Sequence, residues 1–225
     1  KGTKMLNADD YIASLMELLK NAYHGRLLYV GLQGSYAREE ATESSDIDIM
    51  VVVRDITVDD LRRYRSAIST LEGCDKSCGF ICGLDELKNW NPLEICHLLH
   101  ITKDYYGTLV ELVPEYTEND VRSFVKMSLG NLYHEICHRF IHASKEQNAA
   151  KLPYSYKAVF FILQNLHYLK SGSFAATKKE LLNVLTGQDR LVLETAIFLS
   201  TGADFDFDET FALLFSWCQE TMINA

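Results

Sequence analysis

The pattern of apolar residues changes at Pro114, and this change restricts the possible folds more than any other feature of the sequence. Before Pro114, short runs rich in β-branched residues alternate with segments of helical periodicity. After it, every segment has helical periodicity. The sequence therefore predicts an α+β fold, with a domain over residues 1–114 that has a mixed β-sheet and flanking helices. An all-α helical bundle is expected over residues 115–225.

The elements within each part follow from the same periodicities. In the first part we expect strands at 26–32, 46–53 and 77–84, helices at 8–24 and 57–73, and short helices closed by a glycine turn over 85–107. In the second part we expect helices at 117–147, 153–171, 177–186, 188–201 and 208–222. Helix breaks are expected at Pro153, Gly172, Gly187 and Gly202, because proline and glycine interrupt helices.

Composition narrows the class of protein. The chain has 225 residues, 48% of them hydrophobic and 24% charged, which is typical of a soluble globular protein with a substantial core. No apolar stretch approaches the roughly 20 residues that span a bilayer, and the first residues do not resemble a signal peptide. Six cysteines without a secretion signal indicate the reducing cytosol, so we expect a cytoplasmic protein.

The net charge of the chain limits the kinds of molecule that it is expected to bind. The net charge of −9 argues against broad nucleic-acid binding, which requires a basic surface. It favours a cationic or metal-chelated partner. We expect no membrane partner, and the sequence does not indicate the oligomeric state.

Two short motifs stand at the ends of neighbouring predicted strands. Gly34-Ser35 follows the first strand, and Asp46-Ile47-Asp48 opens the second. Because side chains two apart in a strand share a face, both carboxylates should project together while Ile47 faces the core. Two adjacent carboxylates repel each other unless a cation lies between them, and Mg²⁺ is the natural choice. The alternative is a solvated strand edge.

The glycine-serine turn complements the carboxylate pair. Glycine allows close approach of the backbone, and serine adds a hydroxyl, so the turn can bind phosphate oxygens. A phosphate-binding turn and a metal site on adjacent strands are what phosphoryl or nucleotidyl transfer requires.

The segment GSYAREEATESSDIDIMVVV, residues 34–53, resembles the nucleotidyltransferases of the DNA polymerase β superfamily. The order of a small catalytic domain and a helical domain is similar to that of the aminoglycoside and lincosamide nucleotidyltransferases of bacteria. The resemblance implies an Mg²⁺-dependent enzyme that transfers a nucleoside monophosphate, most often AMP from ATP, to a hydroxyl of a small acceptor and releases pyrophosphate. A cationic acceptor such as an aminoglycoside would suit the negative charge.

The resemblance also implies roles for individual residues. Gly34 and Ser35 would hold the triphosphate, and Asp46 and Asp48 would bind one or two Mg²⁺ ions as the catalytic carboxylates. Arg38 would help to neutralise the triphosphate or would pair with a neighbouring glutamate.

The helical half contributes a second group of candidates. Lys157 stands where some of these enzymes place a lysine toward the nucleotide phosphates, or it is a surface lysine. Tyr154 and Tyr156 are expected to pack in the core, with a role in a substrate or base pocket as the alternative.

One departure from the family pattern concerns a third carboxylate, which family members usually carry on the third core strand. The matching position in this sequence falls near Cys78, one of three cysteines at four-residue spacing that we interpret as core thiols. Either another acid supplies this group, or the protein does something other than transfer. The candidate acids are Asp75, Asp85, Glu86 and Glu135.

Other histidines are interpreted without a catalytic role. His134, His138 and His142 share a helix face at a spacing that suits a metal, but nothing else of metal-ligand type accompanies them. Cys96, His97 and His100 are interpreted as packing residues.

Two other functions stay open on the sequence alone. The first is a nucleotidyltransferase of toxin-antitoxin type that adenylylates a partner protein. The second is a non-catalytic relative that binds nucleotide or serves as a scaffold. Polymerisation is the least expected function, because an acidic chain offers no basic track for a nucleic-acid strand.

Overall fold

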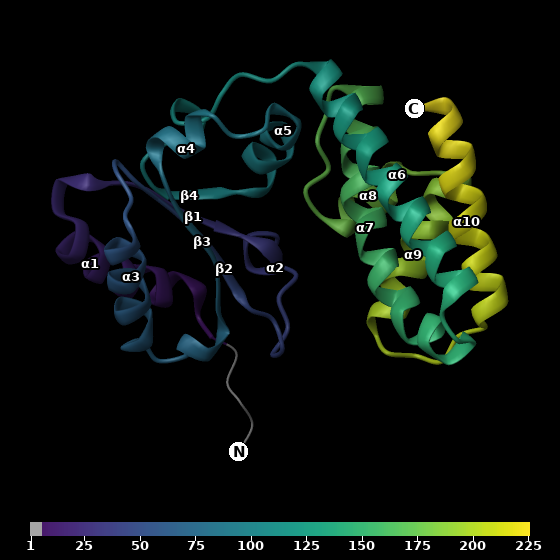
Figure 1. Cartoon of the computed structure of the whole chain (residues 1–225), viewed down its shortest axis with the longest axis horizontal. Coiled ribbons are helices and arrows are strands. Elements are labelled where there is room, and N and C mark those ends of the chain that lie inside the picture. Colours follow the sequence, from purple (N-terminus) through teal and green to yellow (C-terminus); the bar gives the residue numbers. More distant parts are fainter. Residues whose placement is uncertain (1–5) are drawn as a thin grey trace. The chain divides into compact units, whose positions relative to one another are not determined.

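The computed structural model describes residues 6–225, and the chain divides into two compact units, one ending at Glu115 and the other beginning at Tyr116. The first unit contains a β-sheet, and the second is entirely helical (Figure 1). No helix within the described residues is both long and apolar enough to cross a bilayer.

The first unit is built on a four-stranded mixed sheet, which confirms the predicted fold class (Figure 1). The strands are β1 (Leu27–Gln33), β2 (Ile47–Val53), β3 (Ser77–Gly83) and β4 (Lys103–Tyr106). Their order is β3-β2-β1-β4, with β1 antiparallel to both β2 and β4, and with β2 parallel to β3. The two strands that carry the motifs are therefore direct neighbours in the centre of the sheet.

Helices cover both faces of this sheet because β2 is apolar on both sides. Ile47, Ile49 and Val51 pack with α1 (Ala8–Tyr23) and α3 (Val58–Ser69). Met50 and Val52 pack on the other face. That face is covered by α4 (Leu84–Lys88) and α5 (Pro92–Ile101), and the turns η1 (His24–Arg26), η2 (Cys74–Lys76) and η3 (Leu109–Glu111) complete the unit.

Strand β4 is the element that the sequence analysis missed. Residues 85–107 were expected to form only short helices and a turn, whereas the segment forms α4, α5 and then a four-residue strand. The run Lys103–Tyr106 lacks an apolar pattern, since three of its four residues are exposed. It becomes a strand because β1 offers it a backbone partner.

The second unit consists of five helices, as the sequence predicts in outline. They are α6 (Glu118–His142), α7 (Lys145–Ser171), α8 (Lys178–Val184), α9 (Gly187–Ser200) and α10 (Phe207–Asn224). Their apolar faces enclose one core that contains Trp217 and Tyr156. The second unit is therefore an all-α bundle.

Two expected features of the bundle are wrong. The expected helix 117–147 ends at His142, because Ser144 caps a new helix by accepting a hydrogen bond from the Gln147 backbone N–H. That new helix continues through Pro153, where a break was expected. Leu152 and Tyr156 on either side of Pro153 are fully buried, and their packing offsets the roughly 3 kcal/mol that an interior proline costs.

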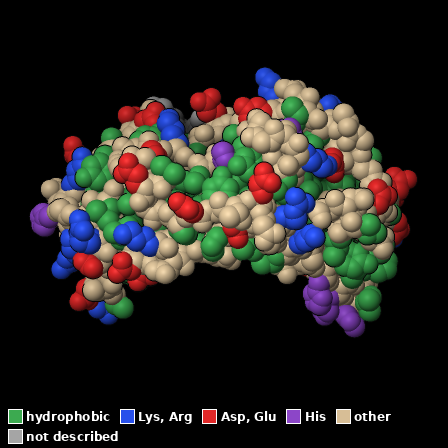
Figure 2. All heavy atoms as spheres, turned by 90° about the horizontal axis from the view of Figure 1, so that it is seen from above, with side chains coloured by type: hydrophobic (Ala, Val, Ile, Leu, Met, Phe, Trp, Pro, Cys, Tyr) green, Lys and Arg blue, Asp and Glu red, His purple; other side chains and the backbone are tan. Residues whose placement is uncertain are grey.

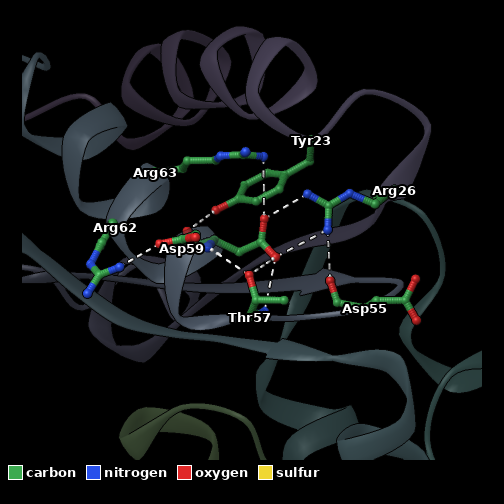
Figure 3. Close-up of polar contacts among 8 residues, drawn as sticks. Tyr23, Arg26, Asp55, Thr57, Asp59, Arg62 and Arg63 are labelled. Atoms are coloured by element: carbon green, nitrogen blue, oxygen red, sulfur yellow. Dashed lines mark hydrogen bonds and ion pairs between the residues drawn. The ribbon is translucent and has the colours of Figure 1, made fainter.

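The buried Asp60 joins the end of α1, the turn η1 and the start of α3 by hydrogen bonds, and Figure 3 shows the partners around it. Asp60 is 2% exposed and caps the first turn of α3. Arg26 donates to its Oδ1 at 2.7 Å, and the Thr57 backbone and hydroxyl donate to its Oδ2 at 3.0 and 2.9 Å. The Tyr23 hydroxyl donates to the Asp60 carbonyl at 2.7 Å. The bond from Arg26 foremost, and those from Thr57, hold the pKa of Asp60 well below its usual range.

We predict that Asp60→Asn destabilises the first unit by about 1–3 kcal/mol at pH 7, because Arg26 and Thr57 lose a charged acceptor. Since folding lowers the pKa of Asp60, its contribution is present above the unfolded value of 3.8 and is lost as the pH falls through and below that value. Urea unfolding of both proteins at pH 7 and near pH 3, followed by Trp90 fluorescence in a Trp217→Phe background, measures this.

The matched control is Asp59→Asn. Asp59 is the adjacent residue in the same helix turn, but its side chain is 71% exposed and pairs with the exposed Arg62 (Figure 3). This variant should unfold close to the wild type, because exposed ion pairs contribute little. Equal losses in the two variants would contradict the account of Asp60.

Candidate active site

A sharp turn begins where β1 ends. The short helix α2 (Gly34–Ala37) follows Gln33 directly. Gly34 has a φ of +68°, which glycine adopts at little cost and other residues avoid. The Glu40 backbone N–H donates to the Ser35 carbonyl at 2.9 Å and closes the segment. The turn therefore keeps Gly34 and Ser35 at the end of the strand.

Asp48 lies directly against this turn. In the register of β1 and β2, Asp48 is the partner of Gln33, the residue before Gly34. A Cβ atom added to Gly34 would lie 2.0 Å from the Asp48 Oδ2 atom and 2.9 Å from its Cγ atom. The carboxylate thus occupies the space that a side chain at position 34 would need. The structure brings these two motif residues into contact.

Asp46 lies one residue before β2 and is exposed, whereas Asp48 is half-buried. Ile47 and Ile49 are fully buried in the core on the opposite face of the strand. Within residues 6–225, no ion pair engages either aspartate. Both carboxylates are therefore available to a cation.

The loop that leads to Asp46 is held by hydrogen bonds. The Ser45 hydroxyl accepts from the Thr42 backbone N–H at 2.9 Å. The Lys76 ammonium group of η2 donates to the Glu43 carbonyl. These bonds restrain the approach to Asp46.

These residues fit a hard divalent cation. Carboxylate oxygens are the ligands that Mg²⁺ prefers, and Mg²⁺ commonly takes one or two carboxylates and completes its shell with water and substrate phosphates. Among the described residues, no group of three or more His, Cys, Asp or Glu side chains is arranged to hold a metal ion. Asp46 and Asp48 would therefore supply only part of the shell.

Arg38 and His97 lie close to the turn. Arg38 pairs with Glu40 at 3.0 Å, and the two side chains are only 12% and 21% exposed. Burial, with a further effect of the Arg38 charge, lowers the pKa of His97 to about 4, so its imidazole is neutral at pH 7. His97 was expected to be a packing residue. No motif marks it, since only the fold brings α5 toward α2.

Cys78 occupies the position on β3 opposite Asp48. The Gly79 backbone N–H favours its thiolate, but burial and a hydrogen bond to the Asp48 carboxylate outweigh this and raise the pKa of Cys78. Cys78 is therefore a neutral thiol at pH 7. It is also exposed, which corrects the expectation that Cys74, Cys78 and Cys82 are all core thiols, since only Cys82 is buried.

The four candidate acids lie in different places. A Cβ on Gly83 would lie 2.1 Å from a Glu86 carboxylate oxygen, so Glu86 lies at the other end of β3 from Cys78, about 17 Å along the strand. Asp85 precedes it in α4. Asp75, in η2, is exposed and belongs to the same end of β3 as Cys78. Asp75 is thus the candidate in the first unit that the chain places nearest to the Asp48 end of the sheet.

Within the helical unit, Glu135 is engaged by its neighbours. Its carboxylate accepts from Arg139 at 2.6 Å and from the Ser155 hydroxyl at 3.0 Å. These bonds give Glu135 a structural role between α6 and α7.

Lys157 and Tyr154 form an exposed pair on α7. The Lys157 ammonium group lies 4.8 Å from the centroid of the Tyr154 ring. Tyr154 is 62% exposed, so the expectation that it packs in the core is wrong, whereas Tyr156 is fully buried as expected. The ring and the ammonium group face solvent together on one surface of the bundle.

Comparison with known proteins shows which protein family part of the first unit resembles. Residues 18–75, which run from α1 to η2 and include the Gly34 turn and Asp48, match the family described as nucleotidyltransferase domain. Residues 18–75 of the first unit are therefore similar to a nucleotidyltransferase domain, and the resemblance read from residues 34–53 is confirmed at this level.

A curated relative has a name that is consistent with this family. A Methanocaldococcus jannaschii protein provisionally named a protein adenylyltransferase is 45% identical over 47 residues, which cover 21% of this chain and 47% of that protein. The chain thus spans about half the length of the curated relative that it matches.

Solved structures extend the likeness to the fold. The spectinomycin adenyltransferase of Enterococcus faecialis, crystallised with ATP and spectinomycin, matches with a TM-score of 0.61 over 96% of this chain and 100% of that chain, at 16% identity. This match supports a common fold for the whole chain. A toxin–antitoxin structure with AMP-PNP reaches a TM-score of only 0.33 at 20% identity, over 60% of this chain and 94% of that chain.

We predict that Gly34→Ala weakens the binding of MgATP by about tenfold or more, since it displaces a carboxylate that would hold the metal. The new Cβ atom would collide with Asp48, and the positive φ would cost a further 1–2 kcal/mol or so of stability. Calorimetric titration with ATP in the presence of Mg²⁺ measures the affinity.

Gly25→Ala is the matched control, because a Cβ at Gly25 meets no atom within 4 Å. It should bind MgATP like the wild type. Unchanged affinity in Gly34→Ala would contradict the contact between the turn and the carboxylate as the basis of the site.

Proposed function

We propose that the chain is an Mg²⁺-dependent adenylyltransferase that moves AMP from ATP to a hydroxyl of a small cationic acceptor, such as an aminoglycoside, and releases pyrophosphate. The observation that carries this proposal is the position of the Asp48 carboxylate in the space beside Gly34. Asp48 would bind a cation, and the turn beside it can bind phosphate, so the two functions would meet at one end of β1 and β2.

Different residues of the site would bind the phosphates and the metal ion. Backbone N–H groups of the turn and the Ser35 hydroxyl would donate to phosphate oxygens. Asp46 and Asp48 would hold Mg²⁺, which when bound neutralises charge on those oxygens. The acceptor hydroxyl would attack the α-phosphorus in line, so that the new O–P bond forms as the bond to pyrophosphate breaks.

Arg38 and Lys157 are proposed as further nucleotide ligands. Arg38 lies beside the turn and carries a positive charge that Glu40 holds in place. On the helical unit, which we propose as the substrate-binding domain, Lys157 offers a cation and Tyr154 offers an exposed ring. An ammonium group next to an aromatic surface suits the phosphates and base of a nucleotide.

The acceptor is proposed from charge and fold together. A net charge of −9 attracts cationic molecules. The fold is similar to that of an enzyme crystallised with spectinomycin. Modification of such an antibiotic would give the protein a role in antibiotic resistance. We place the reaction in the cytoplasm, since the six cysteines are all free thiols, as in a reducing compartment.

Two alternatives have specific observations in their favour. The M. jannaschii relative, provisionally named a protein adenylyltransferase, favours a protein as acceptor. The neutral thiol of Cys78 beside Asp48 favours a nucleotide-binding protein without catalysis, because the thiol supplies no negative charge to the metal site.

Transfer of the α-phosphate of ATP tests the proposal. With ATP labelled at the α-phosphate, Mg²⁺ and a panel of aminoglycosides and lincosamides, we expect the label on an acceptor and pyrophosphate in solution. Asp46→Asn and Asp48→Asn should each lower the rate by several orders of magnitude, because each removes a metal ligand, while circular dichroism stays unchanged.

Other results select among the alternatives. Label on a co-expressed protein and on no small molecule would favour the protein acceptor. Nucleotide binding without transfer to any acceptor would favour the non-catalytic function. Near-normal transfer by Asp48→Asn would contradict the assignment of the site.

A further inference from the structure

Three histidines form an exposed stripe on α6 of the helical unit. His134, His138 and His142 follow one another at intervals of one turn, and all three are exposed. The ring centroids of His134 and His138 are 6.0 Å apart, and those of His138 and His142 are 4.7 Å apart. Figure 2 shows histidine side chains that project together at one edge of the surface. We call these three residues the histidine stripe.

The ring spacing suits two imidazoles on one metal ion. A metal–nitrogen bond of about 2.0–2.1 Å and tetrahedral angles place the centroids of two bound imidazoles roughly 5 Å apart. The two observed separations lie on either side of this value. Because the helix already holds each pair at the required spacing, only small changes of side-chain rotamer are needed to close a chelate.

The side chains around the histidine stripe leave its imidazoles available to a metal ion. The stripe lines an open hollow of about 470 Å³ together with Glu135, Arg139 and Ala143. Arg139 is the basic side chain of this hollow, and it is held by Glu135 at 2.6 Å and by Ser155 at 2.6 Å. Among the described residues, no histidine of the stripe takes part in an ion pair. Arg139 is therefore engaged by Glu135 and Ser155, and its charge is balanced.

We propose that the histidine stripe binds a divalent transition-metal ion, Zn²⁺, Ni²⁺ or Cu²⁺, through two neighbouring imidazoles at a time. Imidazole nitrogen suits these ions, whereas Mg²⁺ prefers oxygen. His138 belongs to both pairs, so the stripe holds one ion at a time. Since no third ligand of the described residues completes the shell, water fills the other positions, and the ion exchanges readily. The site is independent of the one at Asp48.

Titration of the full-length protein with Ni²⁺ tests the proposal, read by calorimetry and by imidazole signals in NMR spectra. We expect the three stripe imidazoles to shift. His138→Gln should lower the affinity by about tenfold or more, because it breaks both pairs. His134→Gln and His142→Gln should each keep most of the binding, because each leaves one pair intact.

His167→Gln is the matched control. This histidine lies on α7 of the same unit, where its ring nitrogen pairs with the Ser171 hydroxyl, and its loss should change nothing. Unchanged Ni²⁺ affinity in His138→Gln would overturn the proposal. Equal losses in all three stripe variants would also overturn it, since His138 would then contribute no more than its two neighbours.

Discussion

The contact between the Asp48 carboxylate and Gly34 is the constraint on which the candidate site depends. Residue 34 has a positive φ and no room for a side chain, and both requirements are met only by glycine. The carboxylate in turn gains a neighbour that exposes backbone N–H groups instead of a side chain. A metal ligand and a phosphate-binding turn can then act on the same triphosphate.

The strand pair that makes this contact is secured at its opposite end. In the antiparallel register, Gln33 faces Asp48 at the site, while Leu27 faces Val53 at the other end. Beside that other end, the buried Asp60 joins η1, the start of α3 and the end of α1. Helices on both faces of the sheet complete the support. Asp48 therefore stands on a supported strand, with Asp46 one residue before it, as the proposed role of these carboxylates requires.

Much of this arrangement could be predicted from periodicity and motif spacing. The central strands follow from their β-branched runs, and the burial of Ile47 beside the less buried Asp48 follows from alternation. Strand β4 could not be predicted, because its four residues become a strand only by pairing with β1. The passage of α7 through Pro153 depends on tertiary packing, which overrides local propensity.

In the site too, the sequence identifies residues but does not show the contacts that they make in the folded protein. The sequence places a cysteine at the third strand but does not show that its thiol is neutral and bonded to Asp48. The pairing of Arg38 with Glu40 was one of two alternatives, and the effect of Arg38 on His97 depends on how α5 packs. Contacts between distant segments are therefore what the sequence could not supply.

A crystal structure with Mg²⁺ and a non-hydrolysable ATP analogue tests the central claim most directly. The account predicts the triphosphate against Gly34 and Ser35, and an ion about 2.1 Å from carboxylate oxygens of Asp46 and Asp48. A nucleotide bound away from this turn, or an ion that neither aspartate contacts, would contradict it.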